Sequence, residues 1–534
     1  MGTNLWKRKL YSTNHNTDVR MDEKTSEKKK DKVATFVGIP QDVFAWSIGI
    51  GFILALLAAM MGFGELRNWD AKSGWTHNDS ETSSARFLPE PTVIEVGVPG
   101  RCDATASSRW YYWQLPPAEA NALSRGIVWF CYASHQLFMW ATIYIAQRLR
   151  AWNPDSGLKY SNTMTKYQWI PLIGNMAFHA VHLAQTHWTY DATAQDVSEA
   201  SSQSSVIMLL VFVLLLEYRD RGLFFGWPSS QHKSKVSRAL RLDLGPINLM
   251  RKYHGYAFAW GAIYTFWYHP MENTWGHLFG FIHTWLLMLQ GSLMFTKIHL
   301  NRYWRLLLES WVTIHATIVA VQTGGPSSDL WAMFFFGFMW LLVMTQLFGL
   351  TFWKKLPWWA NPLPFLVYII ICIGLYGFYF VDSEGRHWIR LNELVRIPSI
   401  EYLAVVWTWF WLWLFLKIEA FIKRRVSNES DRPISAAMEI VYIFLCLIMY
   451  TLLVIVSYLV QELDFKVDLI ALMVMLTGIF SLLVCITMML LKQIMRPIRN
   501  GKIVPSPEHS SSTKTIEMNG KENGVVDNDG FLAE

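Results

Sequence analysis

Residues 43–65, VFAWSIGIGFILALLAAMMGFGE, carry only one charged side chain, Glu65, at the end of the run. About 20 apolar residues are enough for a helix to cross the roughly 30 Å hydrocarbon core of a membrane. The run lies too far into the chain, and is too long, to be a secretory signal peptide. It therefore predicts a transmembrane helix.

The composition of the whole chain supports the same reading. Of the 534 residues, 52% are hydrophobic and 16% are charged, whereas about 25% are charged in an average soluble protein. The 28 Trp fit a protein that meets membrane–water interfaces. A soluble enzyme, a disordered chain and a coiled coil are excluded on these grounds. The net charge of +6 does not indicate a nucleic-acid partner, and the five Cys form no Cys-x-x-Cys pair.

Apolar runs of this kind recur along the chain and predict an all-α, polytopic transmembrane bundle of about twelve spans. The fourth and fifth runs are short, and the count falls to eleven if one of them does not cross. The runs are 43–65, 126–147, 168–190, 205–218, 253–269, 275–297, 304–322, 330–352, 363–381, 402–421, 434–460 and 467–491.

The placement of basic residues predicts the orientation. If the amino terminus is cytoplasmic, the cytoplasmic connections and their flanks carry 21 Lys and Arg, and the external connections carry 8. This bias follows the positive-inside rule and places both termini in the cytoplasm. The sequon Asn78-Asp79-Ser80 then lies outside the cell or in a lumen, so we expect a glycoprotein.

The chain divides by composition into two tails and two groups of spans. Spans one to seven hold most of the histidines, and spans eight to twelve are interpreted as a scaffold. The predicted units are the cytoplasmic amino-terminal tail 1–41, the His-rich bundle 42–322 with its external loop 68–124, the scaffold 323–491 and the disordered cytoplasmic tail 492–534.

Histidine placement is the strongest functional signal. An ionisable residue within a membrane span is a functional candidate, because burying it in hydrocarbon costs free energy. Ten of the 15 His lie in or at the ends of spans two, three, five, six and seven. Only His254 and His299 are predicted at the inner boundary. The eight predicted in the outer half are His135, His179, His182, His187, His269, His277, His283 and His315.

Neutral imidazole is a common ligand for Fe, Cu and Zn. His179 and His182 lie on one face of span three, and His283 and His315 are predicted at a similar depth on spans six and seven. We expect these four to bind a transition metal. His135, His269 and His277 are expected to bind a cofactor, with Glu272 as a supporting carboxylate. The alternative is that the histidines only form hydrogen bonds between helices.

A two-haem arrangement is disfavoured by helical phase. His254 and His269 are 15 residues apart and lie about 60° apart around span five. Their partners would be His283 and His299, which are 16 residues apart and lie about 160° apart around span six, on nearly opposite faces. A single haem bound by two histidines in the outer half of the membrane remains an alternative.

These patterns predict a metal- or haem-dependent membrane enzyme, an oxidoreductase or a lipid-modifying enzyme, that acts on a lipidic or apolar substrate. The alternative is a transporter or channel with a His-lined, pH-sensitive outer vestibule, and a receptor or scaffold is a third reading. Membrane lipids are the expected partners, in the plasma membrane or the endoplasmic reticulum. Carboxylates are few, and Glu309 is expected to pair with Arg305 one turn away.

Overall fold

The computed structural model describes most of the chain between residues 35 and 503. The described residues are 35–69, 71, 121–152, 160–189, 197, 199–229, 235–323, 330–379, 387–426, 436–462, 469–495, 498–499 and 502–503. Asn78, most of the external loop 68–124, and nearly all of both predicted tails lie outside these residues.

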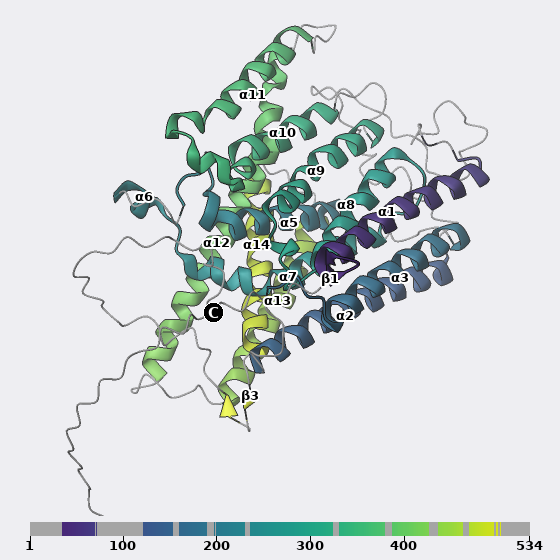
Figure 1. Ribbon diagram of the computed structural model, residues 1–534. Coiled ribbons are helices and arrows are strands. Elements are labelled where there is room, and N and C mark those ends of the chain that lie inside the picture. Colours follow the sequence, from purple (N-terminus) through teal and green to yellow (C-terminus); the bar gives the residue numbers. More distant parts are fainter. Residues whose placement is uncertain are drawn as a thin grey trace, which may run out of the picture.

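Thirteen α-helices make up most of the described chain (Figure 1). Their bounds are α1 Gln41–Leu66, α2 Ala122–Trp152, α3 Lys166–Thr189, α5 Glu199–Arg221, α6 Lys235–Leu240, α7 Leu244–Trp267, α8 Trp275–Ser292, α9 Arg302–Thr323, α10 Leu330–Met344, α11 Leu363–Gly374, α12 Glu393–Val426, α13 Ala436–Glu462 and α14 Leu469–Ile494.

Short elements connect or extend these helices. The 3₁₀ helices are η2 Ile298–Leu300, η3 Gln346–Gly349, η4 Thr351–Lys355, η5 Trp358–Ala360 and η7 His387–Asn392, and η6 Leu375–Tyr379 is a π-helical continuation of α11. Two antiparallel pairs of very short strands complete the described chain: β1 Thr35–Phe36 with β2 Ile39–Pro40, and β3 Ile498–Arg499 with β4 Lys502–Ile503.

Each of the twelve predicted runs overlaps an α-helix, so the all-α prediction is confirmed. Five segments of the described chain are long and apolar enough to cross a membrane: Gln41–Leu66, Trp331–Gly349, Trp358–Phe378, Arg390–Phe421 and Val474–Ile494. The count of twelve spans and the cytoplasmic termini stay predictions.

The boundary of the sixth run was predicted wrongly. The run 275–297 reads as one span, but α8 ends at Ser292 and the chain turns before η2 begins at Ile298. Phe295 in this turn has φ +62°, which a non-glycine residue adopts only where the surrounding structure holds it. Apolar content alone does not show the break, because Leu293, Met294 and Phe295 extend the hydrophobic run.

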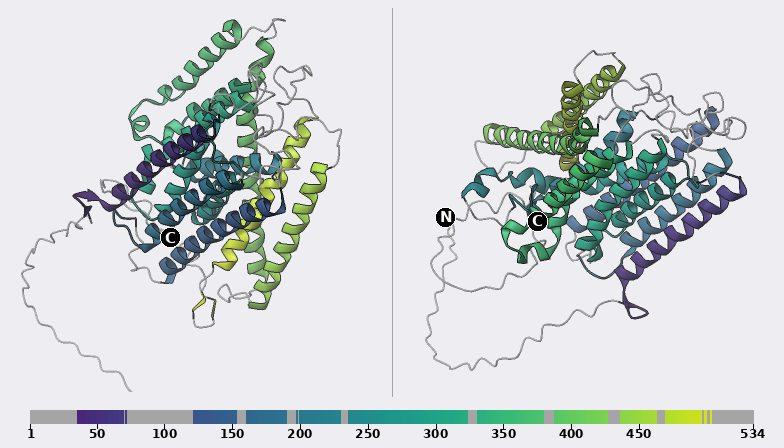
Figure 2. Two further views of the ribbon diagram at one scale, coloured as in Figure 1. Left: turned by 90° about the vertical axis from the view of Figure 1, so that its right-hand side faces the viewer. Right: turned by 90° about the horizontal axis from the view of Figure 1, so that it is seen from above.

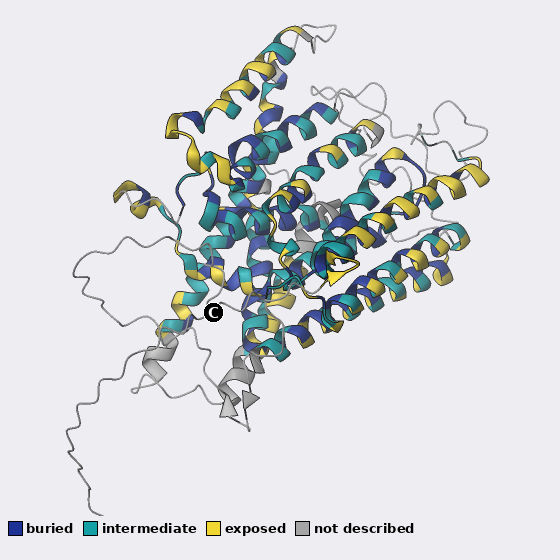
Figure 3. Cartoon of the chain, in the orientation of Figure 1, coloured by how far each residue is buried: buried dark blue, intermediate teal, exposed yellow. Residues whose placement is uncertain are grey.

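Helices α7 and α8 form the centre of the bundle, and their starts are defined by polar caps. Asp243 accepts the backbone N–H of Gly245 before α7, and Thr274 accepts the backbone N–H of His277 before α8. Trp267 and Trp285 on these helices are 1% and 0% exposed. Burial decreases toward the periphery of the bundle (Figure 3).

Helices α13 and α14 lie side by side at one edge of the molecule (Figure 2). Helix α14 also packs against α12, and α11 packs against α10 at another edge. The segment Trp358–Phe378 includes α11, and only 17% of its apolar 18-residue stretch is buried within the protein. These peripheral helices present apolar surface outward, as lipid-facing helices do.

Candidate functional site

The histidines of α7, the turn that follows it, α8, η2 and α9 lie in three close pairs. Each pair joins residues from different elements, so tertiary packing rather than helical spacing brings them together. The pairs are His283 with His315, His269 with His277, and His254 with His299.

The His283–His315 pair joins α8 to α9. The two Nδ1 atoms are 3.4 Å apart and the ring centroids are 5.6 Å apart. Two imidazole nitrogens on one tetrahedral ion, with bonds of about 2.0–2.1 Å, lie about 3.3–3.4 Å apart. A hydrogen bond between one protonated and one bare nitrogen has a similar length. Gly280 makes room for the His315 ring, because a Cβ there would lie 2.9 Å from Nε2.

The His269–His277 pair lies at the turn from α7 to α8. The ring centroids are 5.8 Å apart. Nδ1 of His269 donates to the carbonyl oxygen of Thr265 at 2.8 Å, and Nδ1 of His277 lies 2.6 Å from the hydroxyl of Thr274. The Glu272 carboxylate is 3.9 Å from the same His277 nitrogen. The turn therefore fixes both rings through Nδ1.

The His254–His299 pair joins α7 to η2, with ring centroids 6.3 Å apart. Nδ1 of His254 donates to the carbonyl of Arg251 at 2.7 Å, and Nδ1 of His299 donates to the carbonyl of Gln290 at 2.9 Å. Neither Nε2 forms a hydrogen bond within the described chain. The helical-phase argument against this pairing was wrong in its premise, because α8 ends at Ser292 and η2 folds His299 back toward α8.

His135 belongs to a buried chain of hydrogen bonds across four helices. The Trp267 indole N–H donates to His135 Nδ1 at 3.1 Å, so the ring proton lies on Nε2. Nε2 donates to Asn175 Oδ1 at 2.8 Å, and the Asn175 amide donates to Ser292 Oγ at 2.9 Å. Ser292 Oγ donates to the carbonyl of Met288 at 2.8 Å. Each side-chain nitrogen and oxygen in this series of hydrogen bonds therefore has a partner.

His179 and His182 are fully buried, at 0% exposure, among aromatic rings. Nδ1 of His179 donates to the Asn175 carbonyl at 2.7 Å, and its Nε2 contacts no hydrogen-bonding group of a described residue. Both nitrogens of His182 are within hydrogen-bond distance of partners: Gln185 Oε1 at 2.9 Å and the His269 carbonyl at 2.7 Å. Phe266 contacts both rings, with centroids 4.2 and 4.7 Å away.

Of the four expected metal ligands, the structure pairs His283 with His315 and places His179 and His182 in the aromatic interior. Within the described chain, no group of three or more His, Cys, Asp or Glu side chains has a metal-binding arrangement. The four-histidine site stays a prediction, as does cofactor binding by His135, His269 and His277.

Sequence reasoning assigned the carboxylate of Glu309 to the wrong partner. Arg221 at the end of α5 donates to Glu309 Oε2 at 2.7 Å, and Arg305 pairs with Glu217 instead. Both contacts span 88 residues. The sequence does place arginines and glutamates near the same predicted membrane face, and this indicates that ion pairs between helices could form. Helical spacing alone, however, favours the i, i+4 pair of Arg305 and Glu309.

The His135 chain predicts a measurable loss of stability. Replacing Asn175 with Ala leaves the His135 N–H and the Ser292 hydroxyl without their Asn175 partner in the interior. An unsatisfied buried polar group costs about 1–3 kcal/mol, so we expect the free energy of unfolding in detergent to fall by about 2–4 kcal/mol. Thr142→Ala, which removes only a bond to its own helix, is the control and should cost less than half of that.

Comparisons with known proteins give no match. No family model, curated protein or solved structure matches this chain.

Proposed function

We propose that this protein is a multi-pass membrane oxidoreductase whose paired histidines bind a redox-active transition metal. The carrying observation is the 3.4 Å separation of Nδ1 of His283 and Nδ1 of His315, which suits two ligands of one ion. Iron and copper are the redox-active metals that imidazole binds well.

Two imidazoles leave coordination positions open. A structural metal site is filled by protein ligands, whereas a catalytic site keeps a position for water or substrate. A two-histidine site on α8 and α9 is therefore suited to chemistry at the metal. An apolar or lipidic substrate fits the surroundings, since Phe279 and Trp311 lie stacked on the same two helices.

A second candidate is electron transfer by a bis-histidine haem between His254 and His299. The ring centroids of these two residues are 6.3 Å apart, and the two imidazoles would supply the ligands of a haem iron, whose chemistry is one-electron transfer. Each Nδ1 donates to a backbone carbonyl, which leaves Nε2 for the iron, as is usual for histidine ligands.

The test is elemental analysis together with an absorption spectrum of the purified, detergent-solubilised protein. About one iron or copper per chain without a Soret band supports the His283–His315 site, and a Soret band supports the haem. A protein free of both that moves a solute across vesicles would contradict the oxidoreductase and support the transporter with a His-lined vestibule.

A further inference from the structure

Helix α12 carries a buried glutamate, Glu401, away from the histidine pairs. The residue is 2% exposed and lies within Arg390–Phe421, one of the segments that are long and apolar enough to cross a membrane. Its Oε2 atom is buried without a hydrogen-bond partner, and no described residue forms an ion pair with the carboxyl group. An ionisable side chain in such a position is a candidate for function, because burying its charge costs free energy.

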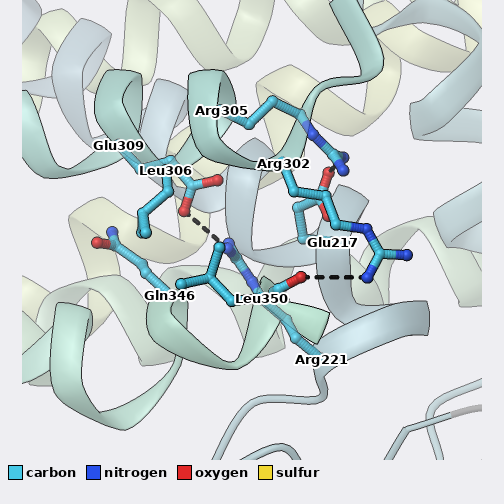
Figure 4. A pocket seen from close by; sticks show the side chains of 9 residues that line it. Glu217, Arg221, Arg302, Arg305, Leu306, Glu309, Gln346 and Leu350 are labelled. Atoms are coloured by element: carbon cyan, nitrogen blue, oxygen red, sulfur yellow. Dashed lines mark hydrogen bonds and ion pairs between the residues drawn. The ribbon is translucent and has the colours of Figure 1, made fainter. Parts of the chain in front are cut away.

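The other buried glutamates of the described chain have what Glu401 lacks. There are four of them, and each carboxylate lies close to a basic side chain. Figure 4 shows one of these pairs, with the side chains of Glu309 and Arg221 pointing toward each other beside a small pocket. The four pairs are Glu309–Arg221 at 2.7 Å, Glu393–Arg390 at 3.1 Å, Glu419–Lys492 at 2.8 Å and Glu272–His277 at 3.9 Å.

The elements that pack against α12 supply no counter-charge to Glu401. These elements are α5, α7, α10, α14 and η7, and α10 has no ionisable residue. The buried ionisable side chains on the other four are Tyr218 and Arg221 on α5, Tyr253 and Tyr256 on α7, Arg390 on η7, and Cys485 on α14. None of these, and no less buried side chain of the described residues, forms a hydrogen bond or an ion pair with Glu401.

The contact between α12 and α14 encloses this face of α12. Glu401 and Thr408 are seven residues apart, so they lie on one face of the helix. Ser481 of α14 donates to the Ala404 carbonyl at 3.5 Å, and the Cys485 thiol of α14 donates to the Thr408 carbonyl at 3.3 Å. The helices are therefore closely packed here. A proton needs no cavity, so close packing does not prevent the carboxyl group from holding one.

From these observations we propose that Glu401 is a proton-binding site of the helical bundle. An unpaired carboxylate in a protein interior costs far more free energy than a neutral carboxyl group does. The Glu401 carboxyl therefore holds a proton while α12 is packed against its neighbours, and it releases this proton to water when they separate. A lower pH then favours the packed bundle. This site is independent of any metal or haem.

Infrared spectroscopy of the full-length protein tests the bound proton directly, at neutral pH in a detergent without carbonyl groups. The C=O stretch of a protonated carboxyl group is separate from the bands of a carboxylate. We expect the wild type to show such a band and Glu401→Gln to lose it. Glu419→Gln is the matched control on the same helix, because Glu419 is ionised by its pairing with Lys492, and it should keep the band. A wild type without the band, or a band unchanged in Glu401→Gln, would overturn the proposal.

The pH dependence of unfolding tests the release of the proton. One proton held only in the packed state changes the unfolding equilibrium constant about tenfold per pH unit. As the pH rises from about 6 to about 8, above the range in which an exposed carboxyl group ionises, the wild type should lose stability relative to Glu401→Gln by this factor. The ratio for Glu419→Gln should not follow this slope, since its carboxylate is ionised in both states.

Glu401→Met is the second variant, and it removes the carboxyl group without adding a group that needs a hydrogen bond. It should show the same missing band and the same pH-dependent ratio if Glu401→Gln fails to fold. A ratio to the wild type that stays constant with pH in the variant that folds would mean that Glu401 is ionised in the bundle. That result would overturn the proton site.

Discussion

Purified His315→Ala protein is expected to contain at least about tenfold less iron or copper than the wild type, because it lacks one of two ligands. His283→Ala should have the same effect, since each imidazole supplies one Nδ1 of the pair. The measurement is elemental analysis at equal protein concentration after the same purification. Metal retained by both variants would contradict the His283–His315 site.

The metal content of the His182→Ala variant distinguishes this two-histidine site from the four-histidine site expected from the sequence. Its two ring nitrogens already have partners in Gln185 and the His269 backbone. In the two-histidine site the metal content of His182→Ala stays at the wild-type level, and in the four-histidine site it falls with that of His315→Ala. His187→Ala, whose ring stacks on Phe63 and Trp69, is the control for nonspecific loss.

Replacing Glu309 with Ala is expected to lower the free energy of unfolding by about 3–5 kcal/mol, because it leaves Arg221 buried without its counter-ion. The pair is 2% and 6% exposed at its side chains. Unfolding by denaturant in a fixed detergent, followed by circular dichroism, measures the change. Lys492→Ala, at the Lys492–Glu419 pair whose side chains are 16% and 9% exposed, should cost less than Glu309→Ala, because the charge that it leaves behind is closer to solvent.

The double variant Arg221→Met with Glu309→Leu tests the cause of this loss. It removes both charges together, so most of the stability should return, since apolar residues of similar volume often replace a buried ion pair without loss. A double variant as unstable as Glu309→Ala would mean that packing around α5 and α9, and not the unpaired charge, controls the effect.

The positions of the helices follow from the sequence, because long apolar runs are a local property of the chain. The pairing of histidines does not, because it depends on where helices end and how they meet. His299 illustrates the point: its apolar flanks extend the run beyond α8, and only the turn at Phe295 brings it beside His254. Helical rise predicts a similar depth for His283 and His315, but their contact depends on the packing of α8 against α9.

The same limit applies to charged residues. Glu309 and Arg305 are one helical turn apart, so the sequence favours their pairing, yet Arg221 from a distant helix takes the carboxylate. Contacts over 88 residues carry no periodic signal in a single sequence.

The hydrogen-bond chain from Trp267 to Ser292 has a consequence for proton movement through the bundle. A proton hops along such a chain only if each group can accept on one side and release on the other. The indole nitrogen of Trp267 donates but does not accept, and the chain ends at the Met288 carbonyl, which accepts but has no proton to pass on. His135 and Asn175 therefore form an insulating segment, and a proton crossing the molecule would need a route that avoids them.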